Sequence, residues 1–262
     1  MSHERQYSDA VLDSMESVYG EGFLSPGGAE EVADILAGVA VAGREVLDLG
    51  CGIGGASLML ARELEAGRVL GIDVEQDSIA RAAAAVEAAG LAGRVTVQLV
   101  APGPIPLPDA GFDVVFSKDV FCHVPDKTPL FAEALRVLRP GGVFAFGDWV
   151  KGEDGPGSAA YDDWAARLRA TGLLFHFGDL EAYLGGLDAA GFTAVELRNH
   201  SAWSAEEARR QLDHTLGPAR EGLRETLGDD GLETRIALTR SRAEALENGA
   251  LLHCHLQARR PA

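Results

Sequence analysis

Cysteine, aromatic residues and positive charge are all scarce in this 262-residue chain. Its three cysteines, Cys51, Cys122 and Cys254, are an odd number without the paired spacing of a metal site, which argues against a disulfide framework. Only 23 lysines and arginines stand against 40 aspartates and glutamates, so the formal net charge is −17. A polyanion of this sign is a poor partner for nucleic acid or an anionic membrane, and it suits a cationic or neutral small molecule.

Long apolar runs are missing as well. No uninterrupted apolar stretch reaches the roughly 18 residues that a membrane span requires, and the first five residues are not followed by an apolar signal segment. We therefore expect a cytoplasmic protein that contacts no membrane, and the sequence leaves open whether it forms a homo-oligomer. Apolar residues make up 47% of the chain, which supports a real core, and the length fits one large domain or a core with an insertion.

Between residues 45 and 147, short apolar runs alternate with longer amphipathic stretches. The apolar runs predict strands and the amphipathic stretches predict helices. Strands that alternate with helices in this way favour a parallel sheet covered by helices on both faces. The expected strands span residues 45–49, 68–72, 95–100, 112–117 and 142–147, and the helices between them span residues 57–64, 77–89 and 128–138.

The two ends of the chain follow a different pattern. We expect the last two strands to form an antiparallel edge of the sheet, with the charged helical stretch between them inserted as a cap. The residues predict helices at 7–18 and 29–36, a loop at 151–158, helices at 159–169 and 179–190, a strand at 193–199, a helical stretch at 206–249 and a final strand at 250–258.

A glycine-rich turn follows the first expected strand and precedes a helix. Gly50, Gly52 and Gly55 satisfy G-x-G-x-x-G, which alone is a weak signal shared with dinucleotide binders. Asp48 lies two residues before the first glycine, where its charge would repel a pyrophosphate but would suit a ligand with an ammonium or a sulfonium group. Asp73 ends the next strand and can accept both hydroxyls of a ribose. The structural alternative is that both acids are helix caps or loop acids.

Four segments together resemble the motif series of class I S-adenosylmethionine-dependent methyltransferases: residues 46–55, 71–74, 112–115 and 138–142. The resemblance spans about residues 29–149. It implies a Rossmann-like, seven-stranded, mostly parallel sheet with helices on both faces and a helical cap insertion. It also implies an N-terminal lid helix and cofactor cover at 1–28, an S-adenosylmethionine-binding core at 29–150, and cap helices with the final strands at 151–262, all in one structural unit.

The resemblance assigns cofactor contacts residue by residue. Asp48 and the glycines would face the methionine portion, and Asp73 would bind the ribose. The family commonly has an acid that contacts the adenine amino group, but this chain has Ala101 there, so packing and backbone groups must hold the adenine. The implied cofactor-binding residues are Tyr19, Leu24, Ser25, Asp48, Gly50, Gly52, Asp73, Val74, Ala101 and Lys118.

A narrower resemblance covers residues 6–9, 19–28 and 117–123, which look like phosphoethanolamine and related amine N-methyltransferases. In that group a tyrosine, an aspartate and a histidine act together over the amine that accepts the methyl group. Carried over by position, these catalytic residues are Tyr7, Asp119 and His123. Leu24, Ser25 and Lys118 would lie near the carboxylate of the cofactor.

The chemistry agrees with this assignment. Methyl transfer is an in-line displacement at a sulfonium carbon, so catalysis consists largely of positioning and desolvation. An ammonium has no lone pair, and an amine acceptor must therefore lose a proton first. Asp119 and His123 are four residues apart, so on a helix the carboxylate can orient the imidazole and raise its basicity. The alternative is that Asp119 caps the next helix and His123 is a packing residue.

Aromatic side chains close to these segments could bind the substrate. Phe121, Trp149 and Phe175 are candidates for a cage whose ring faces attract a cation, although aromatics at strand ends are often ordinary core. The stretch 166–175 lacks the charged donors that a buried phosphate requires. We therefore expect a bulkier, non-phosphorylated amine, such as an intermediate of a specialised metabolite or an antibiotic.

Other interpretations remain open. His253 and His255 would share one face of the final strand and could touch a metal, but packing at an edge strand is favoured and no metal is expected. His123 could equally deprotonate a hydroxyl or serve C-methylation, because a fold does not fix the chemistry. A nicotinamide-dependent oxidoreductase would share the glycine turn, but no Tyr-x-x-x-Lys pair is evident. A non-catalytic cofactor-binding protein is the third alternative.

Overall fold

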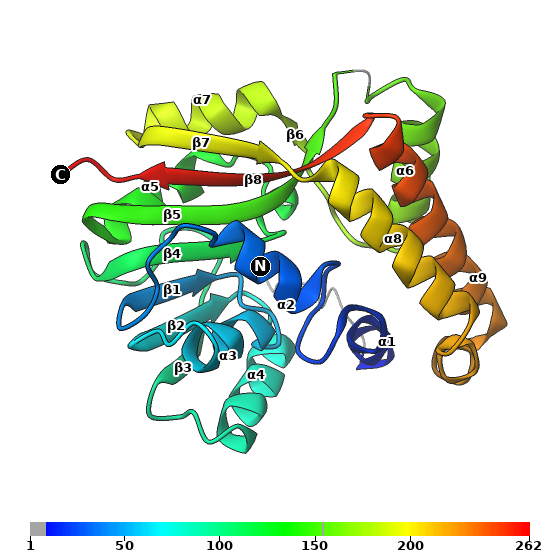
Figure 1. Ribbon diagram of the computed structural model, residues 1–262, viewed down its shortest axis with the longest axis horizontal. Helices are drawn as coiled ribbons and strands as arrows, with labels where there is room; N and C mark the ends of the chain where they lie inside the picture. The colour runs from blue at the N-terminus through cyan, green and yellow to red at the C-terminus, as the bar shows by residue number, and fades with distance from the viewer. Residues whose placement is uncertain (1–8, 154) are drawn as a thin grey trace.

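The computed structural model describes residues 9–153 and 155–262 (Figure 1). Tyr7, one of the expected catalytic residues, lies outside the described residues.

A single twisted sheet forms the centre of the described structure, with the strand order β3-β2-β1-β4-β5-β8-β7. Neighbouring strands from β3 to β5 are parallel, whereas β8 runs antiparallel to both β5 and β7. A short strand, β6, pairs with β5 off this path. The strands are β1 (Glu45–Leu49), β2 (Arg68–Asp73), β3 (Val95–Leu99), β4 (Phe112–Lys118), β5 (Leu138–Lys151), β6 (Gly178–Asp179), β7 (Thr193–Asn199) and β8 (Leu251–Arg259).

Helices cover both faces of this sheet. Helices α2, α3 and α4 pack against one face, and α5 and α7 pack against the other. The side chains of β1 alternate accordingly: Val46 joins the first of these two cores and Leu47 the second. The helices are α1 (Asp9–Tyr19), α2 (Gly28–Ile35), α3 (Gly55–Arg62), α4 (Gln76–Ala88), the 3-10 helix η1 (Phe121–His123), α5 (Thr128–Val137), α6 (Ala159–Ala170), α7 (Leu180–Ala190), α8 (Ser201–Leu216) and α9 (Arg220–Glu247).

The expected Rossmann-like, mostly parallel α/β fold is confirmed, including the antiparallel pair at the end of the chain. Several ends of elements are shifted, most of all in β5, which spans residues 138–151 where a strand was expected at 142–147. Two further details differ from the expectation. The two-residue β6 adds an eighth strand, since so short a segment has no apolar pattern to detect. The helical stretch expected at 206–249 begins earlier, at Ser201, and is divided into α8 and α9 at Gly217 and Pro218, where proline cannot continue a helix.

The two longest helices, α8 and α9, form a cap beyond the end of the sheet. They connect β7 to β8 and pack against each other, against α6 and against α1 (Figure 1). Within α9, Gly228 has φ 73° and ψ 174°, which breaks the helix into two parts. Within residues 9–153 and 155–262, no helix combines the length and the apolar character that a bilayer span requires.

Adjacent glycines in α7 provide a test of how this face of the core packs. A methyl group added at Gly186 would lie 2.9 Å from the Phe131 ring, whereas one added at Gly185 would meet nothing within 4 Å. We expect Gly186→Ala to destabilise the protein by about 1–3 kcal/mol through overpacking. Gly185→Ala should stabilise it by about 0.5–1 kcal/mol through higher helix propensity. Urea unfolding measures both, and equal midpoints for the two variants would contradict this packing.

Candidate active site

A cavity of about 1200 Å³ opens at the carboxyl ends of β1, β2 and β4. In parallel sheets, ligands bind at this edge, where the order of the strands reverses. Its volume exceeds the usual range of about 300–1,000 Å³ for a small-molecule pocket, so a cofactor and an acceptor molecule can fit together. Residues from α1, from the segment 171–177 and from the cap helix α9 line the far side of the cavity.

The glycine turn forms one wall of this cavity. Gly50 and Gly52 have φ values of 79° and 52°, a region that favours glycine. A side chain at Gly50 would also collide with Val120, so the backbone is held close to the segment after β4. The Gly55 amide donates to the Gly22 carbonyl at 3.0 Å, which fastens the segment after α1 over the start of α3. Leu24 and Ser25 therefore line the cavity next to the turn.

Asp48 lies at the end of β1 and is almost fully buried. Its Oδ2 accepts a 2.5 Å hydrogen bond from the Ser57 hydroxyl. Burial raises the pKa of this carboxyl to about 7, although the Ser57 bond opposes the rise. Asp48 therefore changes its charge near neutral pH, and a cationic ligand group in this part of the cavity would favour the ionised form.

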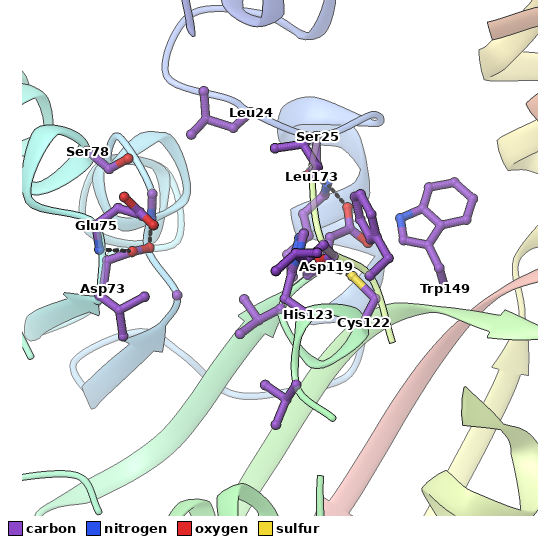
Figure 2. Close-up of a pocket in the computed structure, with 18 of the residues that line it drawn as sticks. Leu24, Ser25, Asp73, Glu75, Ser78, Asp119, Cys122, His123, Trp149 and Leu173 are labelled. Carbon is purple, nitrogen blue, oxygen red and sulfur yellow. Dashed lines mark hydrogen bonds and ion pairs between the residues drawn. The ribbon is translucent and has the colours of Figure 1, made fainter. Parts of the chain in front are cut away.

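Asp73 joins the end of β2 to the glycine turn. Its Oδ2 accepts from the Gly52 amide and its Oδ1 from the Glu75 amide, both at 2.9 Å. Each carboxylate oxygen retains a second lone pair, so the group could still accept two hydroxyls. Figure 2 shows Asp73 and Glu75 on one side of the cavity, opposite Asp119 and His123. Val74 and Ala101 line the wall on the Asp73 side.

The expected pairing of Asp119 with His123 is wrong. Asp119 has a left-handed backbone, with φ 56°, and the short helix η1 begins only at Phe121, so no helical turn joins the two residues. The Asp119 carboxylate instead contacts Lys118 at 2.9 Å and His253 at 3.2 Å. The alternative that Asp119 caps a helix is also wrong, because η1 has no side-chain cap.

His123 is held by a different partner. Its Nδ1 lies 2.8 Å from the Leu174 carbonyl, which can only accept, so Nδ1 carries the proton and Nε2 keeps a lone pair. Burial lowers the pKa of His123, against the opposing effect of this hydrogen bond, and the ring is therefore neutral at pH 7. The ring also packs against Phe175, with centroids 4.4 Å apart. The side chain lines the cavity and has the state that a general base requires.

The other expected residues fall into two groups. Tyr19, Trp149 and Phe175 line the cavity, as does Lys118, whose ammonium donates to the Ser25 hydroxyl and the Pro26 carbonyl at 2.6 Å. Phe121 does not face the cavity as a substrate-binding residue would. It is fully buried and stacks on Phe131 with centroids 4.6 Å apart, because η1 turns this side chain into the core.

Two arginines that the sequence did not single out reach the cavity from α9. Arg242 donates to Gln211 at 2.5 Å and lies 5.9 Å from the Trp149 ring centroid, and Arg235 donates to Ser14 at 2.7 Å. Burial raises the pKa of Tyr19, but the two arginines outweigh this effect and lower it overall. Arg235 and Arg242 are seven residues apart and therefore lie on one face of α9. In the sequence this spacing is only a weak sign of a functional pair, because charged residues occur on all sides of the helix.

Comparisons with known proteins agree with this geometry. The Methyltransferase domain family matches residues 47–146. Phosphoethanolamine N-methyltransferase 1 of Arabidopsis thaliana is 32% identical over 79% of the chain, which spans only 41% of that relative's length. The 27-O-demethylrifamycin SV methyltransferase of Amycolatopsis mediterranei is 31% identical over 97% of the chain and 95% of its own length. The chain belongs to the class I S-adenosylmethionine-dependent methyltransferases, whose cofactor is S-adenosylmethionine.

Solved structures show the same fold. The phosphoethanolamine N-methyltransferase 2 of Haemonchus contortus, solved with phosphomonomethylethanolamine and S-adenosylhomocysteine, superimposes with a TM-score of 0.88 at 23% identity. This match covers 99% of the chain and 59% of the solved chain. The [4+2]-cyclase SpnF matches with a TM-score of 0.75 at 25% identity, over 97% of the chain and 94% of its own. A shared fold therefore includes proteins with different chemistry.

The raised pKa of Asp48 predicts that ligand affinity depends on pH. If the ammonium of S-adenosylhomocysteine binds beside Asp48, ionised Asp48 is favoured and the affinity should rise as the pH increases from 5.5 to 7.5, by about tenfold. Asp48→Asn should bind more weakly at pH 7.5 and lose this pH dependence. Titration calorimetry measures both quantities. Asp148→Asn is the matched control, because burial likewise raises the pKa of Asp148 to about 7 outside the cavity lining. An unchanged pH dependence in Asp48→Asn would contradict the assignment.

Proposed function

We propose that this chain transfers a methyl group from S-adenosylmethionine to an amine nitrogen of a small molecule. The observation that carries the proposal is the contact of His123 Nδ1 with the Leu174 carbonyl, which leaves Nε2 to act as a base in the cavity that Asp119 and the glycine turn also line. A base and an anion next to a sulfonium donor are what the methylation of an ammonium substrate requires.

The cofactor would lie along the carboxyl ends of β1 and β2. Asp48, Gly50 and Gly52 would hold the methionine portion, and Asp73 with Val74 the ribose. Tyr19, Leu24 and Ser25 would cover it from the α1 side, in keeping with their place in the cavity lining.

The adenine would pack next to Ala101. Lys118 would act through Ser25, because its ammonium already donates to that hydroxyl.

The reaction would proceed in two steps on this chain's own residues. Burial would raise the pKa of Asp119, but Lys118 and His253 outweigh it and hold that pKa well below its usual range, so the carboxylate attracts the ammonium substrate. His123 Nε2 then takes one proton from the ammonium. The freed nitrogen lone pair forms the N–C bond as the C–S bond breaks, and the electron pair of that bond stays on the sulfur of S-adenosylhomocysteine.

Other residues would assist these steps. The ring faces of Trp149 and Phe175 would attract the cationic groups. Tyr7 is proposed as a third catalytic residue on the resemblance alone.

The proposed division of the chain has residues 29–150 as the cofactor-binding core, residues 1–28 as its cover, and residues 151–262 as the cap and final strands.

The acceptor proposed here is a bulky, non-phosphorylated amine, for example an intermediate of a specialised metabolite or an antibiotic. The cavity volume supports a large acceptor. The relative matched along nearly its whole length is named for methylation of a demethylrifamycin.

That same relative favours a second candidate, O-methylation of a large hydroxylated molecule. His123 Nε2 could take a proton from a hydroxyl as well as from an ammonium. The two candidates differ at Asp119, because an anion attracts an ammonium through its charge, whereas it can only accept a hydrogen bond from a neutral hydroxyl. Replacement of Asp119 should therefore affect methylation of an amine much more than methylation of an alcohol.

Transfer of a labelled methyl group tests the proposal directly. Benzylamine and N-methylbenzylamine serve as simple amine probes, next to benzyl alcohol and phosphoethanolamine. We expect methylation of the amines, and His123→Gln should lower that rate by about 10²–10⁴-fold while S-adenosylhomocysteine still binds. His176→Gln is the matched control, since His176 also lines the cavity but bonds through its backbone. Equal or better turnover of phosphoethanolamine would refute the proposed substrate class.

A further inference from the structure

Four buried side chains form a closed ring of alternating charges behind the cavity wall. The Lys118 ammonium contacts Glu31 Oε2 at 3.1 Å and Asp119 Oδ2 at 2.9 Å. His253 Nε2 contacts the other oxygen of each carboxylate, Glu31 Oε1 at 3.1 Å and Asp119 Oδ1 at 3.2 Å. Each of the four side chains is at most 6% exposed. The ring thus connects α2, the end of β4 and β8.

The ring is electrically neutral only when His253 is an imidazolium. Two carboxylates and one ammonium leave one negative charge, and an unpaired buried charge is strongly unfavourable. Burial lowers the pKa of His253, but Glu31 and Asp119 outweigh this effect and raise it overall. The second ring nitrogen, Nδ1, lies 2.8 Å from the Ser204 hydroxyl on α8, whose oxygen can accept a hydrogen bond from Nδ1–H. The imidazole also stacks on Trp149 with centroids 4.0 Å apart.

A metal ion is the alternative occupant of this region. Glu31, His253 and His255 offer ligand atoms that lie within 4.8 Å of one another. A divalent cation there would face the Lys118 ammonium, which contacts the same Glu31 carboxylate at 3.1 Å. It would also add positive charge to a ring that protonated His253 already neutralises. The contacts therefore favour the ion-pair ring.

Of the four members, Asp119 and Lys118 line the cavity. Glu31 and His253 can reach a ligand only through Asp119 and Lys118. We propose that Glu31 and His253 are positioning residues, which with Lys118 keep the Asp119 carboxylate ionised and fixed at the methyl-acceptor space. This inference rests on the proposed function, because it assigns Asp119 to the acceptor amine.

Other titratable groups surround the ring and contribute to its pH response. His255 contacts Glu31 Oε1 at 3.4 Å from the same strand, outside the closed cycle. Burial and the neighbouring histidines lower the pKa of His200, which stacks on His255. Besides the ring's own members, the described groups that interact electrostatically with it are Cys122 and His123 of η1, Asp148 of β5, Tyr183 of α7, His200 before α8 and His255 of β8.

The first test measures the protonation state of His253 in the ring and requires no substrate. Nitrogen-15 NMR of histidine-labelled wild-type protein should show His253 with both ring nitrogens protonated at pH 7.5, and Asp119→Asn should lower the pH at which it loses a proton. A neutral His253 at pH 6.5 would overturn the proposal. Elemental analysis is run on the same sample, and stoichiometric bound zinc or another transition metal would also overturn it.

The second test compares two histidines of one strand. With benzylamine as acceptor, His253→Gln should lower kcat by about tenfold to a hundredfold, a part of the usual contribution of acid–base groups. It should also shift the acidic limb of the kcat/KM profile to higher pH, with the affinity for S-adenosylhomocysteine unchanged. His255→Gln is the matched control and should keep its rate within about threefold. Equal effects of the two variants would overturn the proposal.

A third variant covers the case in which His253→Gln fails to fold. Glu31→Gln/His253→Gln removes one charge of each sign, so the remaining pair of Lys118 and Asp119 is neutral. It should fold and still show the shifted acidic limb, and a wild-type rate and pH profile would overturn the proposal. If the wild type methylates no amine at all, the proposed function fails, while the NMR titration still decides whether the ring exists.

Discussion

The hydrogen bonds of Asp73 are the constraint on which the rest of the site depends. This carboxylate accepts the amide of Gly52 in the turn after β1 and the amide of Glu75 after β2, so it fixes two neighbouring strand ends as one surface. Gly50 and Gly52 adopt positive φ values and carry no side chain, so the backbone of the turn lies open to the cavity at these two positions. The cavity, the place of Asp48 and the position of the segment after α1 all follow from this arrangement.

Local sequence signals predicted most of the fold. The apolar runs of β1, β2 and β4 and the order of strand, glycine turn, helix and acid depend on neighbours within about 30 residues, and the structure contains them in that order. The same patterns predicted the cap and seven of the eight strands, all but the short β6, and the resemblance implied the same architecture. The residues Gly217 and Pro218 already indicate a break between two helices, but the charged residues on both sides made the region look like one continuous helical stretch.

The sequence predicted less of the candidate site, because the residues that contact one another there are distant in the chain. His253 contacts Asp119 across 134 residues, and Lys118 reaches Ser25 across 93, and neither contact leaves a local pattern. The spacing of Asp119 and His123 suggested a helical pair, whereas the left-handed backbone at Asp119 separates them. The burial of Phe121 in the core depends on tertiary packing, and so does the position of Arg235 and Arg242 at the cavity. His253 also joins the cap to the site, through Ser204 of α8.

A crystal structure of the protein with S-adenosylhomocysteine is the most direct test of the account. The ribose hydroxyls should lie within about 2.5–3.0 Å of the Asp73 carboxylate oxygens. The methionine portion should lie at Asp48 and the glycine turn, with the sulfur facing the space between Asp119 and His123. A nucleoside bound elsewhere in the cavity, or an Asp73 carboxylate without a ribose contact, would contradict it.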